Sequence, residues 1–104
     1  MNNKFAQFNI NSFNNNQLNN QVINYPDGSR YVGQIINGLR EGKGTFYFNN
    51  GDRYEGEWRN DKMEGKGIIY YSNGDREMGN FYNDEPIGKF VKLTKSGKVI
   101  ENYY

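Results

Sequence analysis

A 23-residue period organises this chain. The segment Tyr54-Glu55-Gly56-Glu57-Trp58 has counterparts at residues 31–35 and 77–81. Glycines keep the same spacing in three columns: Gly28, Gly51, Gly74 and Gly97; Gly33, Gly56 and Gly79; Gly42, Gly65 and Gly88. A fixed period of this length is typical of repeat arrays, in which each unit packs mainly on its neighbours. The chain is therefore predicted to form one short array and not a domain around a central core.

Turn residues recur at the same interval. They are Pro26-Asp27-Gly28, Asn49-Asn50-Gly51, Ser72-Asn73-Gly74 and Lys95-Ser96-Gly97. Because Gly and Asn accept the positive φ of a tight turn, these segments predict four β-hairpins. The strands are expected at about 22–26 and 29–36, 43–49 and 52–59, 66–72 and 75–82, and 89–95 and 98–104. The polar segments 37–42, 60–65 and 83–88 are predicted to be looser loops between hairpins.

Alternation along each strand separates the side chains onto two faces. One face carries Tyr31, Tyr54, Ile35, Trp58, Phe81, Tyr104, Ile23, Phe46, Ile69, Tyr25, Phe48 and Tyr71, with glycines among them. Glycine inside a strand costs about 0.5–1 kcal/mol relative to alanine. We therefore expect the glycine columns to make room for aromatic rings that lie flat on the backbone. The opposite face mixes Glu55, Glu57 and Arg59 with an apolar strip of Val22, Thr45, Ile68, Val91, Tyr47, Tyr70 and Leu93.

Composition excludes most enzyme chemistry. The chain has no cysteine and no histidine, which removes disulfides, thiol nucleophiles, the usual zinc sites and histidine-based catalysis. Glu55 and Glu57 share a face but have no cleft or basic neighbour that would separate their pKa values, so they are expected in solvated cross-strand pairs. We predict no catalytic residue, no metal and no cofactor. The balance of 13 basic against 12 acidic residues argues against nucleic acid as a partner.

The first 21 residues differ from the rest of the chain. They are rich in asparagine, with Phe5, Phe8, Ile10, Phe13 and Leu18 as their large apolar side chains after Met1. Their spacing suits either an edge strand at 8–10 or a short helix. We expect this tail, residues 1–21, to dock on the array of residues 22–104 or on another chain. No secretory or transit signal and no long apolar run is present, which predicts a cytoplasmic protein without a transmembrane segment.

The central repeat resembles a known family. Tyr54-Glu55-Gly56-Glu57-Trp58, followed by Glu64-Gly65-Lys66-Gly67 and the turn Asn73-Gly74-Asp75, is similar to the MORN repeat (membrane occupation and recognition nexus). The resemblance covers residues 22–104 and implies an all-β, elongated, single-layer twisted antiparallel sheet of about four tandem hairpins. The C-terminal part departs from the pattern at Glu77, Phe90, Lys92, Thr94 and Asn102. These departures either cap the array or shape a contact.

The resemblance also implies a function. MORN proteins serve mainly as scaffolds, so a non-catalytic structural subunit that contacts other protein chains is expected, in a ciliary axoneme or another microtubule-based cytoskeletal complex. The alternatives are a peripheral module for anionic phospholipid and a regulatory subunit of an enzyme. Lys89, Lys92, Lys95 and Lys98 make the last hairpin basic, but their spacing scatters them over both faces, which favours a solvated surface over lipid binding.

A one-layer sheet has two open edges and cannot bury both faces. Exposed apolar strips and unpaired strands favour association, so we predict that the chain is not a stable free monomer. The aromatic columns are first the core of the sheet, and they are also the candidate contact surface. The predicted partner-binding residues are Tyr31, Phe46, Phe48, Tyr54, Trp58, Tyr71 and Phe81, with Tyr47 and Tyr70 as the alternative surface on the opposite face.

Overall fold

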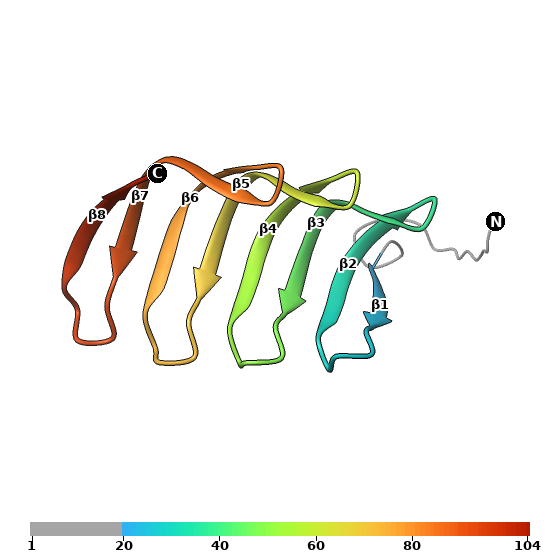
Figure 1. The fold of residues 1–104 in the computed structure, drawn as a ribbon, viewed down its shortest axis with the longest axis horizontal. Helices are drawn as coiled ribbons and strands as arrows, with labels where there is room; N and C mark the ends of the chain where they lie inside the picture. Colours follow the sequence, from blue (N-terminus) through green and yellow to red (C-terminus); the bar gives the residue numbers. More distant parts are fainter. Residues whose placement is uncertain (1–19) are drawn as a thin grey trace, which may run out of the picture.

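Residues 20–104, the part of the chain described by the computed structural model, form one antiparallel sheet of eight strands (Figure 1). The strands are β1 (Asn20–Asn24), β2 (Arg30–Ile36), β3 (Leu39–Tyr47), β4 (Arg53–Arg59), β5 (Lys62–Tyr70), β6 (Arg76–Tyr82), β7 (Glu85–Leu93) and β8 (Val99–Tyr103). Each strand pairs with its neighbour in sequence, in the order β1 to β8. No helix occurs in this range. The predicted all-β, single-layer array of four hairpins is confirmed.

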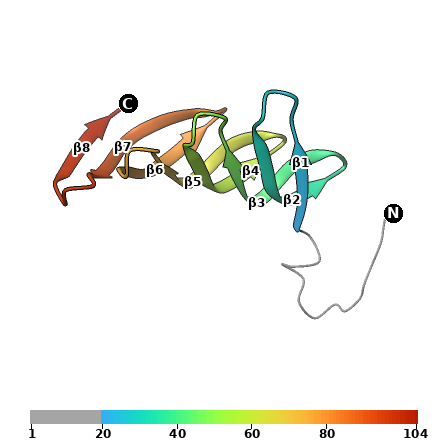
Figure 2. The same cartoon turned by 90° about the horizontal axis from the view of Figure 1, so that it is seen from below.

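The sheet is elongated and curved. Its principal extents are 45 × 25 × 24 Å. Figure 2 shows that neighbouring strands are twisted relative to one another, so the single layer curls along its length. This twist is the normal consequence of the handedness of L-residues in extended strands. Curling lets one layer partly enclose the side chains on one of its faces, which is how a sheet with no second layer can have a core.

The four predicted hairpin turns have one geometry. In the first, Tyr25 N donates to Ser29 O at 3.0 Å and Gly28 N donates to Tyr25 O at 3.1 Å. The same pair of hydrogen bonds recurs at the other three turns. The third turn residue is the glycine, with φ of +93° at Gly28 and similar values at Gly51, Gly74 and Gly97. Glycine is required there because other residues adopt this left-handed conformation only with strain.

The segments between hairpins are not the loose loops that we predicted from the sequence. They are two-residue turns, in which both residues have positive φ: 54° and 78° at Asn37-Gly38, 49° and 71° at Asn60-Asp61, and 54° and 71° at Asn83-Asp84. Two consecutive positive φ values match the twist of a two-residue hairpin, and Asn, Asp and Gly tolerate them best. The strands β3, β5 and β7 therefore begin at 39, 62 and 85, four residues earlier than predicted.

The glycines that we expected to close those loops instead form bulges inside strands. Pairing between β2 and β3 shifts register after Gly33, and Gly42 has φ of +77°. Equivalent shifts occur between β4 and β5 and between β6 and β7. In the first two bulges a side chain of the partner strand accepts a backbone hydrogen bond, from Lys43 N to Gln34 at 2.6 Å and from Lys66 N to Glu57 at 2.7 Å. The bulges increase the local bend of the sheet.

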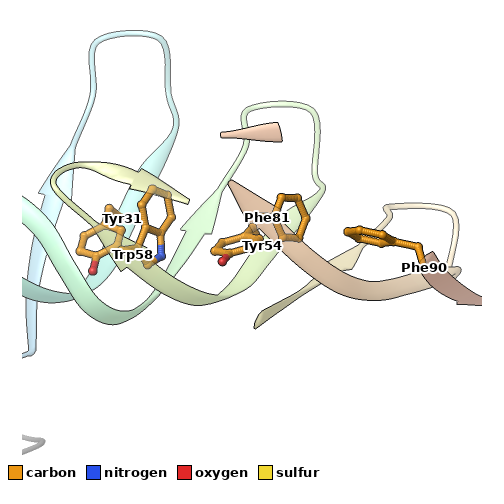
Figure 3. Close-up of a cluster of buried hydrophobic side chains, with 5 residues drawn as sticks. All are labelled: Tyr31, Tyr54, Trp58, Phe81 and Phe90. Carbon is orange, nitrogen blue, oxygen red and sulfur yellow. The ribbon is translucent and has the colours of Figure 1, made fainter. Parts of the chain in front are cut away.

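The core lies along one face. Its buried members are Tyr31, Tyr54, Trp58, Phe81 and Phe90, and Figure 3 shows their rings in a row along the array. Ile23, Tyr25, Ile35, Phe46, Met63 and Ile69 pack against them. This face is the one predicted from strand alternation, with Phe90 and Met63 as additions. At the N-terminal end β1 begins at Asn20, so the last two residues of the predicted tail pair with β2. The predicted docking of residues 1–19 lies outside the described residues.

Candidate protein-interaction surface

The core rings contact each other edge to face from one repeat to the next. Tyr31 and Tyr54 each lie 5.3 Å from Trp58 between ring centroids, at 82° and 88°. The row continues from Tyr54 to Phe81 with 5.1 Å between centroids. It then runs from Phe81 to Phe90 at 5.3 Å and from Phe90 to Tyr104 at 5.1 Å. Each such pair contributes about 0.5–1.5 kcal/mol beyond burial of its area. The row joins the repeats and forms the floor of the aromatic face.

Glycines allow the leading tyrosines to lie on the backbone. A Cβ added at Gly67 would overlap the Tyr54 ring, and one at Gly44 would overlap Tyr31. Each tyrosine hydroxyl reaches across the bulge of its own repeat. Tyr31 Oη donates to Gln34 O at 2.8 Å, and Tyr54 Oη donates to Glu57 O at 2.7 Å. Burial raises the pKa of Tyr31 to about 12. The predicted packing of rings over glycine is therefore present in the first two repeats.

The third repeat builds the same layer from the other strand. Glu77 stands where the period expects the leading tyrosine, and Phe90 stands where it expects the glycine equivalent to Gly67. The Phe90 ring lies over Gly79, so closely that a Cβ there would overlap it. The buried ring is thus supplied by β7 and not by β6. This exchange leaves the Glu77 carboxylate on the aromatic face.

Glu77 is 3% exposed and accepts hydrogen bonds from neutral groups. Tyr71 Oη donates to its Oε1 at 2.9 Å, while Asn102 Nδ2 and Tyr104 Oη donate to its Oε2 at 2.7 and 3.1 Å. Burial, and then the hydrogen bond to Glu77, raise the pKa of both tyrosines. Sequence reasoning missed this cluster, although Glu77 and Asn102 were recognised as departures from the period.

A second polar residue on the aromatic face is Arg40. Its guanidinium Cζ lies 4.6 Å from the ring centroid of Trp58, 5.4 Å from Phe46 and 5.9 Å from Tyr25. Its Nε also donates to Asp61 at 2.6 Å. Burial alone would raise the pKa of Asp61, but the hydrogen bonds and charge of Arg40 outweigh it and hold that pKa below its usual value. Arg40 therefore covers the rings of the first repeats as a fixed cation.

The seven predicted contact residues divide into two groups. Tyr31, Tyr54, Trp58 and Phe81 are buried and make the core. Phe46 and Tyr71 are half-buried, and Phe48 is 36% exposed, so these three side chains border the accessible part of the face. Partner binding by any of the seven stays a prediction. The surface that remains open to a partner is narrower than the full aromatic column.

That accessible part contains a cavity of about 340 Å³. Its lining extends from Phe48, directly after β3, to Tyr104, directly after β8, and includes the rings of Phe48, Tyr71, Phe81, Phe90 and Tyr104 and the carboxylate of Glu77. Aromatic walls with few polar groups are typical of binding sites in proteins. The cavity combines the predicted aromatic face with the Glu77 cluster that the sequence reasoning missed.

The opposite face is covered differently. Arg53 lies over the Tyr70 ring at 3.9 Å and Arg30 lies over the Tyr47 ring at 4.6 Å. Arg53 also pairs with Glu55 at 2.9 Å. A second hollow of about 410 Å³ is lined by Glu55, Lys66, Gly67, Ile68, Met78, Gly79 and Asn80. The alternative surface at Tyr47 and Tyr70 is therefore partly shielded by the chain's own arginines.

Residues 20–104 contain no cluster of three or more His, Cys, Asp or Glu side chains arranged for a metal ion. A helix long and apolar enough to cross a bilayer is likewise not found in the described part of the chain. The described surface offers aromatic rings, two hollows and a few charges. These are means of binding another molecule.

Comparison with known proteins identifies the repeats. A search of curated proteins found no match. The MORN repeat family matches residues 31–53 and 54–76, which are the two units that begin at Tyr31 and Tyr54. MORN repeats are known in protein–protein and membrane–lipid interactions, and their all-β fold is typically non-catalytic. Residues 31–76 are therefore two consecutive MORN repeats inside one continuous sheet.

Proposed function

We propose that this chain is a non-catalytic scaffold subunit whose sheet binds other protein chains in a larger assembly. The observation that carries the proposal is the exposure of large apolar side chains on a sheet without a second layer. Tyr82 is 60% exposed, and Val22, Ile36, Leu39, Met78 and Ile87 are also exposed. Contiguous apolar surface on a folded protein usually marks a contact with another molecule.

The charges of the last hairpin favour a protein partner over a lipid surface. Lys89 pairs with Glu101 at 2.9 Å, and Lys92 pairs with Asp75 at 3.6 Å. Each pair neutralises a lysine that an anionic membrane would need. Attraction of about 1 kcal/mol per lysine requires several unpaired cations near one plane. Two of the four lysines in the basic hairpin are already matched by carboxylates of the chain itself.

The proposed setting is a microtubule-based cytoskeletal complex such as a ciliary axoneme, in the cytoplasm. Support for the setting comes from the scaffold roles that the family resemblance implies. An elongated sheet with two open edges suits an assembly in which neighbours cover its faces.

Fractionation of cells that express the tagged chain tests this proposal. The chain is expected in the detergent-insoluble cytoskeletal fraction, and it should resist extraction with salt. Phe48→Glu and Met78→Glu place a charge on the aromatic and the opposite face, and at least one of them should release the chain. Ser96→Glu, at an exposed polar residue in the last hairpin turn, is the matched control. Recovery of the unaltered chain in the soluble fraction, or salt-sensitive binding to anionic liposomes in its place, would contradict the scaffold role.

A further inference from the structure

The cavity on the aromatic face contains a buried carboxylate that has no cationic partner. A carboxylate offers about four acceptor positions, and Glu77 uses three of them, for Tyr71, Asn102 and Tyr104. All three donors are neutral. Among residues 20–104, no ion pair within 4 Å includes Glu77. Lys92 is its cross-strand neighbour but directs its amine to Asp75 at 3.6 Å.

A buried charge without a partner is unfavourable, so its presence calls for a compensating group. Buried acidic side chains in proteins are nearly always paired. Asp52, which also lines the cavity, takes part in no ion pair in the described part of the chain either. The lining of the cavity therefore contains two carboxylates and five aromatic rings but no lysine or arginine; Lys92 lies outside the lining, with its Nζ 5.3 Å from the centroid of the Tyr71 ring. The charge of the cavity is complementary to a positively charged group.

The first repeat shows which cation this environment accepts. There the guanidinium of Arg40 lies on the rings of Trp58 and Phe46 and pairs with a carboxylate. Met63 and Pro86 occupy the positions equivalent to Arg40 in the following repeats. Pro86 on β7 pairs with Phe81 on β6, as Met63 on β5 pairs with Trp58 on β4. Pro86 borders the cavity. The third repeat thus has aromatic rings and a carboxylate, that of Glu77 where Arg40 uses Asp61, but a short uncharged residue at the arginine position.

We propose that this cavity binds an arginine side chain of a partner protein. The guanidinium stacks on the aromatic walls and donates to the free acceptor position of Glu77, as Arg40 does with its own rings and carboxylate. Arginine suits the site better than lysine because its planar group stacks on rings and donates several hydrogen bonds at once. The volume of about 340 Å³ fits one long side chain. This inference rests on the proposed function, because the arginine belongs to a bound protein.

Titration of the full-length, isotope-labelled chain with N-acetyl-arginine N-methylamide tests the inference by NMR. Amide shifts are expected to concentrate at residues 48, 52, 71, 77, 90 and 104. The citrulline analogue has almost the same shape but no charge, and should bind roughly tenfold or more weakly, because charge-assisted hydrogen bonds are stronger than neutral ones. Equal binding of the citrulline analogue, equal binding of the lysine analogue, or shifts scattered over the sheet would overturn the proposal.

Two variants locate the binding to the carboxylates. Glu77→Gln keeps the length and most hydrogen bonds of the side chain but removes its charge, so affinity for the arginine probe should fall roughly tenfold. Glu55→Gln, on the opposite face, is the matched control and should leave affinity unchanged. If Glu77→Gln does not fold, Asp52→Asn takes its place, with an expected loss of roughly threefold for the more exposed carboxylate. Unchanged affinity in the folded variant would refute the site.

The outcome is independent of the fractionation test. A chain that binds the arginine probe but leaves the cytoskeletal fraction contradicts the scaffold proposal alone. A chain that stays in that fraction and shows no response to the probe contradicts the arginine site alone.

Discussion

The Trp58 indole connects three features of the aromatic face. It lies between the rings of Tyr31 and Tyr54, its Nε1 donates to Gly44 O at 3.1 Å, and the Arg40 guanidinium covers it. The side chain is only 4% exposed, although the sheet has no second layer. At this position burial comes from the curl of one sheet and from rings of adjacent repeats. A single residue therefore supports packing in two units at once.

We predict that Trp58→Ala is among the most destabilising single changes in the chain. Removal of a buried aromatic side chain costs about 3–5 kcal/mol, through lost burial and through the cavity that remains. Urea unfolding followed by far-UV circular dichroism measures the effect, since the variant lacks the only tryptophan. Tyr103→Ala, at an exposed residue, is the control and should change the free energy of unfolding by less than about 0.5 kcal/mol. A loss below about 1 kcal/mol for Trp58→Ala would mean that the indole is not buried.

The third repeat, which begins at Glu77, shows how the residues can change while the layer of aromatic rings is kept. In the second repeat a tyrosine on β4 lies over a glycine on β5, as seen for Tyr54 and Gly67. In the third, the ring comes from Phe90 on β7 and the β6 position carries Glu77. Both arrangements place one ring in the same layer between neighbouring strands. The two positions must therefore change together. Rings at both positions would overlap, and the absence of a ring at both would leave a cavity.

A double-mutant cycle measures this coupling. Glu77→Tyr alone should destabilise the chain because the new ring meets Phe90. Phe90→Gly alone should also destabilise it, by removing a buried ring. The double variant restores the pattern of Tyr54 and Gly67 and should be more stable than the two single effects predict, by about 1–3 kcal/mol. Additive effects in urea unfolding would show that the two positions do not share one space.

At the scale of the whole molecule, the core is a line and not a sphere. Buried tyrosines occur along this line, and their hydroxyls remain protonated at neutral pH. Burial raises the pKa of Tyr31 to about 12 and also raises the pKa of Tyr54 and Tyr71. The unfolded chain would release these protons near pH 10, the ordinary value for tyrosine. Stability of the entire array is therefore linked to pH in the alkaline range.

We predict that the free energy of unfolding falls as the pH rises from about 10 toward 12. The pKa of Tyr31 is higher in the folded chain than in the unfolded chain. Its contribution to the free energy of unfolding is therefore complete below the unfolded-state pKa and is lost as the pH rises to the folded-state pKa. Each such proton contributes a slope of about 1.4 kcal/mol per pH unit in this window. Urea midpoints at several pH values test this, with Tyr31→Phe as the comparison, because its curve should be flatter above about pH 10. Parallel curves for the two proteins would contradict the assignment to Tyr31.

The exposed apolar side chains and the open edges at β1 and β8 predict association of the isolated chain. Light scattering coupled to size exclusion should give a mass above the 12.1 kDa of one chain, or show aggregation that a co-expressed partner relieves. Soluble monomers rarely expose apolar patches beyond a few hundred Å². A monodisperse monomer at tens of micromolar would contradict this prediction, because it would show that the exposed apolar side chains and strand edges are stable in water without a partner.

Sequence alone determined the four hairpins with glycine turns, the face of each aromatic column and the resemblance to the MORN repeat, but not where β3, β5 and β7 begin. These features follow from local chemistry, since turn glycines set backbone φ and alternation sets the side of each residue. Only the tertiary structure decided that the loops are two-residue turns, that Gly42 and its counterparts form bulges, and that Phe90 replaces a tyrosine ring. The Glu77 cluster was also undecided, because its partners Asn102 and Tyr104 lie 25 and 27 residues away. Such contacts depend on strand register and on the direction of each ring, which a period in the sequence does not specify.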